Sequence, residues 1–193
     1  MAARRPKMIY CFGRSKTEGK GHQKPLLGGK GANLAEMTSI GIPVPPGFTI
    51  TTEVCSHFHD RSHRFPPSLR KELNGALDQL EKSMGKRFGD PTNPLLVSVR
   101  SGARVSMPGM MDTVLNLGLN DETVDGLANL TENPRFAWDA YRRFIQMYSD
   151  VVLEVRAAKG ETQSPFTRAL DDLKRKRGVT EDTELEAQDW MGL

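Results

Sequence analysis

Residues 95–119 read Leu-Leu-Val-Ser-Val-Arg-Ser-Gly-Ala-Arg-Val-Ser-Met-Pro-Gly-Met-Met-Asp-Thr-Val-Leu-Asn-Leu-Gly-Leu, and this stretch is the most informative part of the chain. It opens with Leu95, Leu96, Val97 and Val99, a near-continuous β-favouring run that is typical of a strand covered on both faces. Arg100 stands at the carboxyl end of that run, where open α/β sheets place their ligands. The pattern therefore predicts a buried strand that delivers one arginine to an anion site.

The segment after Arg100 is a loop that has little use in building a core. Its glycines and its proline permit or impose unusual backbone geometry. Its methionines, Met107, Met110 and Met111, supply a flexible and polarizable surface that can adapt to a ligand. The alternative is that Arg100 makes a minor surface ion pair and that the loop fills a gap in the core.

A second candidate cation, Lys30, follows a pair of glycines. The motif Gly28-Gly29-Lys30-Gly31 precedes an apolar segment of helical period, so backbone amides and the lysine would point from a helix start toward a phosphate. The motif is not a P-loop, because neither the earlier glycine nor the following hydroxyl residue of that pattern is present. A surface lysine at a helix start is the open alternative.

Three stretches of the chain resemble the pyruvate phosphate dikinase family. They are residues 98–120, residues 26–37 together with 41–50, and residues 133–152. Phosphoenolpyruvate synthases share the Gly-Gly-Lys-Gly and Val-Arg-Ser elements, but they lack the Met-Pro-Gly-Met-Met-Asp-Thr wording of residues 107–113. The dikinase family is therefore the better match, and a related synthase-like dikinase is the second choice.

The resemblance implies an α/β (α+β) fold, namely an incomplete ATP-grasp-like nucleotide-binding domain with a helical subdomain. We expect residues 1–115 to form the first part of the nucleotide-binding domain. Residues 116–193 are expected to form the helical subdomain, truncated at its C-terminal end. From Trp190 to Leu193 we expect large apolar residues with no following element to cover them. We also expect that the isolated chain either has an exposed sheet edge or needs a partner.

The resemblance also implies a function for the intact enzyme. Members of the family convert ATP, phosphate and pyruvate to AMP, pyrophosphate and phosphoenolpyruvate by way of a histidine on another domain. It implies ATP and Mg²⁺ as cofactors, with the metal ligands mostly in later sequence. The implied partners are ATP or AMP, the phosphohistidine and pyruvate/phosphoenolpyruvate domains, and a second subunit in a homodimer.

The family places triphosphate contacts at the positions of Lys30 and Arg100, and we assign the catalytic and ATP-binding roles to these two residues. Phosphoryl transfer spreads negative charge over several oxygens, which cations and backbone amides stabilise. Further candidates for ATP binding are Gly29, Ser101, Asp112 and Thr113. Ser106 is another candidate hydroxyl donor. Asp112 could orient Arg104 or approach magnesium, although it serves equally well in a turn or a helix cap.

The histidines carry no sign of the family's relay chemistry. The relay histidine lies in a Thr-Ser-His-Ala context, which none of the chain's histidines shares: His22, His57, His59 and His63. We therefore expect this chain alone to be inactive. A truncated, non-catalytic module that binds nucleotide, anion or protein is the alternative function.

Cys55, His59 and His63 recur every four residues, which raises the question of a metal site. Their flanking residues match no known ligand spacing, so we favour a surface helix with scattered imidazoles and assign no metal ligand. Cys11 and Cys55 are the two cysteines, too few for a disulfide framework.

Charge and hydropathy exclude several classes of protein. The 27 Lys and Arg residues against 24 Asp and Glu give a net charge of +3, which is too small for a nucleic-acid-binding footprint. The basic run 174–177 closes a helix expected from Ser164 to Gly178. No apolar run reaches the ~20 residues needed to span a membrane, and no secretory signal is evident, so we expect a cytoplasmic protein.

The remaining elements follow from periodicity and from helix-breaking residues. We expect a strand near Tyr10, a helix from Lys30 that ends at Gly41, and an extended segment at 48–50. Further helices are expected at 53–61, 68–84, 121–130 and 134–156, and the start of another at 181–186.

Overall fold

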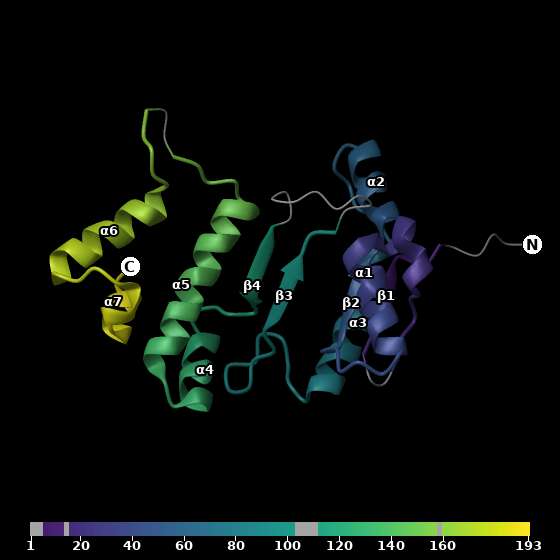
Figure 1. Cartoon of the computed structure of the whole chain (residues 1–193), viewed down its shortest axis with the longest axis horizontal. Coiled ribbons are helices and arrows are strands. Elements are labelled where there is room, and N and C mark those ends of the chain that lie inside the picture. The colour runs from purple at the N-terminus through teal and green to yellow at the C-terminus, as the bar shows by residue number, and fades with distance from the viewer. Residues whose placement is uncertain (1–5, 14–15, 103–111, 158–159) are drawn as a thin grey trace, which may run out of the picture. The chain divides into compact units, whose positions relative to one another are not determined.

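The computed structural model describes residues 6–13, 16–102, 112–157 and 160–193 (Figure 1). The chain divides into two compact units, the first made of Met1–Gly85 with Ser101–Met111 and the second of Lys86–Arg100 with Asp112–Leu193. These limits differ from the two expected domains, 1–115 and 116–193, and that domain assignment stays a prediction.

The first unit is built on an antiparallel pair of strands, β1 (Ile9–Phe12) and β2 (Gly47–Ile50), in which Ile9 lies opposite Ile50. Its helical elements are η1 (Gly21–Gln23), α1 (Lys24–Ser39), α2 (Thr52–Asp60) and α3 (Leu69–Met84). The strand near Tyr10 and both helices after β2 are thus confirmed to within one residue at each end.

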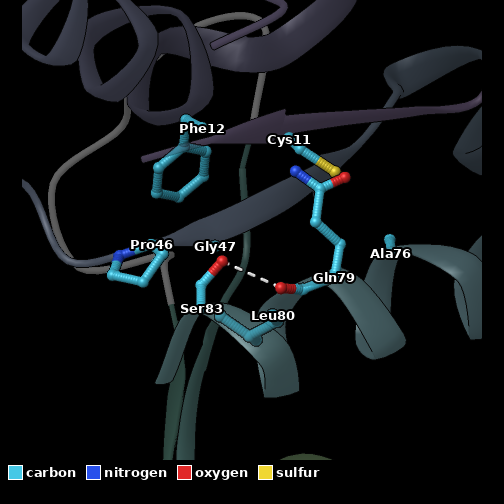
Figure 2. Close-up of a pocket in the computed structure, with 8 residues that line it drawn as sticks. All are labelled: Cys11, Phe12, Pro46, Gly47, Ala76, Gln79, Leu80 and Ser83. Carbon is cyan, nitrogen blue, oxygen red and sulfur yellow. Dashed lines mark hydrogen bonds between the residues drawn. The ribbon is translucent and has the colours of Figure 1, made fainter. Parts of the chain in front are cut away.

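The core of the first unit lies between the two strands and the helices α2 and α3. It consists of Met8, Ile9, Cys11, Val54, Leu69 and Ala76, with Phe48 and Leu73 packed against it. A small cavity beside this core is lined by residues of β1, β2 and α3, and there the Ser83 hydroxyl donates to the Gln79 carbonyl over 2.8 Å (Figure 2). Burial, helped by the nearby Glu18 carboxylate, raises the pKa of the Cys11 thiol, so Cys11 acts here as a small apolar side chain.

The second unit contains another antiparallel pair, β3 (Val97–Arg100) and β4 (Thr113–Leu117). Its helical elements are α4 (Thr123–Thr131), α5 (Pro134–Val151), α6 (Pro165–Arg177), η2 (Asp182–Glu184) and α7 (Ala187–Met191). A small core forms where α4 packs on α5, from Val124, Ala128 and Ala137. The Asn133 side chain caps α5 by accepting from the Phe136 amide, and Ser164 caps α6 by accepting from the Thr167 amide.

The described residues combine helices with two small antiparallel sheets, so a mixed α and β fold is confirmed. The expectation of a strand buried on both faces is wrong, however. Leu95 is 2% exposed, but it precedes β3, and within β3 Val99 is 48% exposed. A two-stranded antiparallel sheet has only one neighbouring strand for each member, and it can leave one face to solvent. Neither sheet has a third strand among the described residues, so each strand has one edge without a partner strand, and the expected exposure of such an edge stays a prediction.

The helix expected at 134–156 ends at Val151, five residues earlier than predicted. Two β-branched residues, Val151 and Val152, are poor helix formers at this point. Glu154 then adopts a left-handed φ of 53° and turns the chain out of the helical path. Phe136, in the first turn of α5, is 49% exposed.

The expectation that Trp190 lacks a covering element is also wrong. Trp190 is 4% exposed, because α7 packs against α5 and the Arg142 guanidinium lies 4.8 Å from the centre of the Trp190 ring. Arg135 on α5 holds the preceding segment by donating to the carbonyls of Leu185, at 2.8 Å, and Asp182, at 3.0 Å. Met191 and Leu193, at 52% and 44% exposed, remain uncovered.

Candidate phosphate-binding site

Lys30 lies just after an interruption of α1. Gly28 has φ 67° and ψ 168°, which is outside the helical region, so Gly29 begins a fresh helical segment. A helix start leaves its first backbone N–H groups without partners inside the helix, and its dipole favours an anion. The glycine pair therefore places Lys30 in the first turn of a helical segment, as the sequence predicts, although Lys24–Leu27 ahead of the kink are helical too.

The glycines on either side of Lys30 differ in their surroundings. A Cβ on Gly31 would lie 2.7 Å from the Thr49 methyl group, so glycine allows this close approach of α1 to β2 without displacing Thr49. A Cβ on Gly29 would meet nothing within 4 Å. Gly31 thus seats the helix on the strand, while the side of Gly29 is open enough for another molecule to approach the backbone.

The Lys30 side chain is half-buried and reaches a distant part of its own unit. Its Nζ donates a hydrogen bond to the main-chain carbonyl of Ser101 over 3.3 Å, across 71 positions of sequence. An ammonium group has three donors. One such contact leaves capacity for the oxygens of an anion.

Arg100 is the last residue of β3 and is exposed, and its cross-strand partner is Thr113, the first residue of β4. Asp112, also exposed, directly precedes Thr113. The second unit thus brings Arg100, Asp112 and Thr113 to one end of the β3–β4 pair. The first unit brings the Lys30 ammonium group to the carbonyl of Ser101.

The remaining members of the expected loop cannot be compared with the structure. Arg104, Ser106, Met107, Met110 and Met111 lie outside the described residues.

Glu18 is a charged centre of the first unit that sequence reasoning missed. Its carboxylate lies 2.5 Å from both the Lys7 and the Lys16 Nζ atoms and accepts from the Cys11 amide at 3.0 Å. Burial on its own would raise the pKa of Glu18, but the hydrogen bonds from Lys16, Lys7 and the Cys11 amide prevail and lower it to about 2. These partners are irregularly spaced along the sequence, so no sequence motif indicates the cluster.

The described part of the chain contains no group of three or more His, Cys, Asp or Glu side chains arranged to hold a metal ion. In the same residues, no helix is both long and apolar enough to cross a membrane.

Similarity to known proteins connects this geometry to a family. The model of the family described as "Pyruvate phosphate dikinase, AMP/ATP-binding domain" matches residues 24–64 and 60–169, which include every described candidate residue. The chain belongs to this family. The family name thus agrees with the resemblance that the Gly-Gly-Lys-Gly and Met-Pro-Gly-Met-Met-Asp-Thr motifs indicate.

Individual members of the family are about half identical to the chain. It is 52% identical over 183 residues to "Pyruvate, phosphate dikinase" of Clostridium symbiosum, covering 95% of this chain and 20% of that protein. It is 50% identical over 185 residues to the protein of the same name from Rhizobium meliloti, which covers 96% of this chain and 20% of that protein. With "Pyruvate, phosphate dikinase, chloroplastic" of Flaveria trinervia the identity is 51% over 187 residues, which covers 97% of this chain and 19% of that protein. The chain therefore spans about a fifth of the length of these relatives.

Proposed function

We propose that the chain supplies ATP-phosphate-binding residues of a pyruvate phosphate dikinase, with Lys30 and Arg100 as the principal phosphate contacts. The observation that carries this proposal is the hydrogen bond from Lys30 to the Ser101 carbonyl, because it joins the glycine-rich helix start to the residue that follows Arg100 in the chain. Both residues fall within the match to an AMP/ATP-binding domain family.

The chemistry of the two side chains suits a polyphosphate. Arg100 presents a planar guanidinium that can bind two phosphate oxygens at once, whereas Lys30 presents a compact and mobile charge. Gly29 adds a backbone amide at the helix start, and Ser101 and Thr113 add hydroxyl groups. Asp112 is a further candidate contact. Mg²⁺ enters the proposal as the ion bound to the ATP phosphates, and no residue of this chain is assigned to it.

In the wider reaction, the β-phosphoryl group of ATP passes to a histidine on another domain and from there to pyruvate. This gives AMP, pyrophosphate and phosphoenolpyruvate in the presence of phosphate. The proposal includes an ATP-grasp-like arrangement of the nucleotide-binding domain, a homodimer, and a cytoplasmic location, although one relative's name places it in the chloroplast. Because no histidine of this chain lies in a Thr-Ser-His-Ala context, the chain by itself is proposed to bind without turnover.

Calorimetric titration of the chain with magnesium-ATP tests the proposal. We expect Lys30→Ala and Arg100→Ala each to weaken binding by about tenfold or more, since a hydrogen bond to a charged group contributes ~1.5–3 kcal/mol. Lys71→Ala and Arg70→Ala, which remove the same charges from exposed positions on α3, serve as matched controls and should bind as the unaltered chain does.

Two results would contradict the proposal. One is unaltered affinity in both Lys30→Ala and Arg100→Ala, and the other is an equal loss in all four variants, which would indicate that only net charge matters. Circular dichroism of each variant shows whether the fold survives the substitution.

A further inference from the structure

The turn after α2 has a strained backbone. Helix α2 ends at Asp60, where the Arg61 amide donates to the His57 carbonyl over 3.0 Å and the His63 amide donates to the Phe58 carbonyl over 2.9 Å. Ser62 and His63 are both left-handed, with φ of 51° and 61°. A left-handed conformation costs a residue with a side chain roughly 1–2 kcal/mol, so two in succession indicate a constraint at this turn.

The strained turn brings His63 back beside the last turn of α2. The His63 and His59 ring centres lie 6.0 Å apart with an interplanar angle of 74°. Phe58 packs edge-on against both imidazoles, at 5.8 Å from His59 and 5.1 Å from His63. The Phe65 ring in turn stacks on Phe58, with the two ring centres 4.6 Å apart. The two exposed imidazoles are therefore held close together by packing.

We propose that His59 and His63 form a two-imidazole site for a borderline divalent transition-metal ion of the Zn²⁺, Ni²⁺ and Cu²⁺ class, with water in the remaining positions. Imidazole nitrogen is a preferred ligand of these ions. At the tetrahedral angle that Zn²⁺ prefers, a metal–nitrogen bond of about 2.0–2.1 Å with a ring centre about 1.1 Å beyond its nitrogen puts two ring centres about 5 Å apart. The observed separation of 6.0 Å is about 1 Å longer, so a small movement of these two exposed side chains brings both nitrogens to one ion.

The position on the helix also favours a cation. Both imidazoles lie at the C-terminal end of α2, where the helix dipole is negative. Packing against Phe58 limits the rotation of the rings, so less entropy is lost when an ion binds. The site is a pair of ligands and not a closed cage, which predicts moderate affinity and an ion open to solvent.

Titration of the whole chain with ZnCl₂, followed by calorimetry, tests the proposal. We expect one equivalent to bind, and we expect His59→Ala and His63→Ala each to weaken binding by about tenfold or more, because the second ligand of a chelate acts at high effective concentration. His22→Ala removes an exposed imidazole from η1 and should leave the affinity unchanged. All three side chains are exposed, so the fold should survive each substitution.

Cys55 lies one helical turn before His59 and is exposed, so a thiol site must be distinguished from an imidazole site. Cys55→Ser should retain binding within about threefold of the unaltered chain if the imidazoles are the ligands. A larger loss in Cys55→Ser than in His59→Ala would overturn the proposal, as would binding by both histidine variants equal to that of the unaltered chain. In a readout that needs no substitution, substoichiometric Ni²⁺ should selectively broaden the imidazole NMR signals of His59 and His63, and signals that stay sharp would likewise overturn it.

Discussion

The two compact units both use glycine to bring a helix close to a neighbouring segment, but the neighbours differ. In the first unit a Cβ on Gly31 of α1 would lie 2.7 Å from a side-chain methyl group of Thr49. In the second unit a Cβ on Gly126 of α4 would lie 2.0 Å from the main-chain carbonyl oxygen of Pro91. The crowding atoms of Thr49 belong to a side chain, which can shift with less strain than a loop backbone can. The first unit should therefore tolerate an added methyl group better than the second.

The largest expected effect comes from placing alanine at these two glycines. Gly126→Ala should lower the free energy of unfolding by about 2–3 kcal/mol, because the added methyl group overlaps a backbone carbonyl. Gly31→Ala should cost less, about 1–2 kcal/mol, since the Thr49 side chain has to shift but alanine favours the helix. Chemical denaturation of each variant measures both values. Equal losses at the two positions would contradict the expected difference in tolerance between the units.

Gly29→Ala is the matched control for this pair. Its Cβ would meet nothing within 4 Å, so we expect stability to be unchanged or slightly improved. A loss as large as that of Gly126→Ala would show that backbone conformation, and not packing, accounts for the effect.

The units also differ in their charged centres. In the first unit a single carboxylate, Glu18, lies between two lysines. In the second unit a single guanidinium, Arg142, contacts the carboxylates of Asp139 at 2.6 Å and Asp182 at 3.3 Å. Hydrogen bonding from Lys174 lowers the pKa of Asp182, against the opposing effect of its burial. Each centre is stabilised by ionised carboxylates, so acid should weaken both units.

Acid titration sharpens this second contrast. Because the pKa of Glu18 falls from 4.5 to about 2 on folding, its stabilising contribution is complete above about pH 4.5 and is lost as the pH falls toward 2. Glu18→Gln should lower stability at pH 7 by about 1–2 kcal/mol and should flatten the fall in unfolding free energy between these two pH values. Denaturant unfolding at several pH values measures this slope. An unchanged slope in Glu18→Gln would mean that other carboxylates account for the acid sensitivity.

The smallest effect concerns the ends of helices. In the first unit, glycine occupies the left-handed position that ends α3, where Gly85 has φ 62°. In the second unit α4 ends instead at Glu132, which has φ 51° and is exposed. Glu132→Gly should therefore raise the free energy of unfolding by about 0.5–1 kcal/mol, because glycine adopts this conformation without steric cost. Gly85→Ala is the reverse change and should lower it by a similar amount. Thermal denaturation of both variants measures the two shifts. A loss of stability in Glu132→Gly, or a gain in Gly85→Ala, would contradict the argument.

Sequence reasoning succeeded where the deciding signal is local. Ser164 and Gly178 bound α6 as predicted, because capping depends on a few neighbouring residues. The helical start at the Gly28–Gly29 pair was predicted for the same reason. The family was recognised from three stretches of sequence, and the match over residues 24–64 and 60–169 confirms it.

Sequence reasoning failed where distant contacts decide. The exposure of Val99 depends on which strands join its sheet, and the burial of Trp190 depends on how α7 packs against α5. Neither is encoded in nearby residues. The spacing of His59 and His63 was visible, but the left-handed turn that places their rings together was not. The ATP contacts of Lys30 and Arg100 stay predictions.

The hydrogen bond between Lys30 and the Ser101 carbonyl has a consequence for any anion that binds at Lys30. If the incoming oxygen replaces the carbonyl as acceptor, binding is an exchange reaction, and its free energy is the difference between two hydrogen bonds and not the whole of one. Selectivity would then favour highly charged acceptors such as polyphosphates, because a neutral oxygen would gain almost nothing over the carbonyl that is already there.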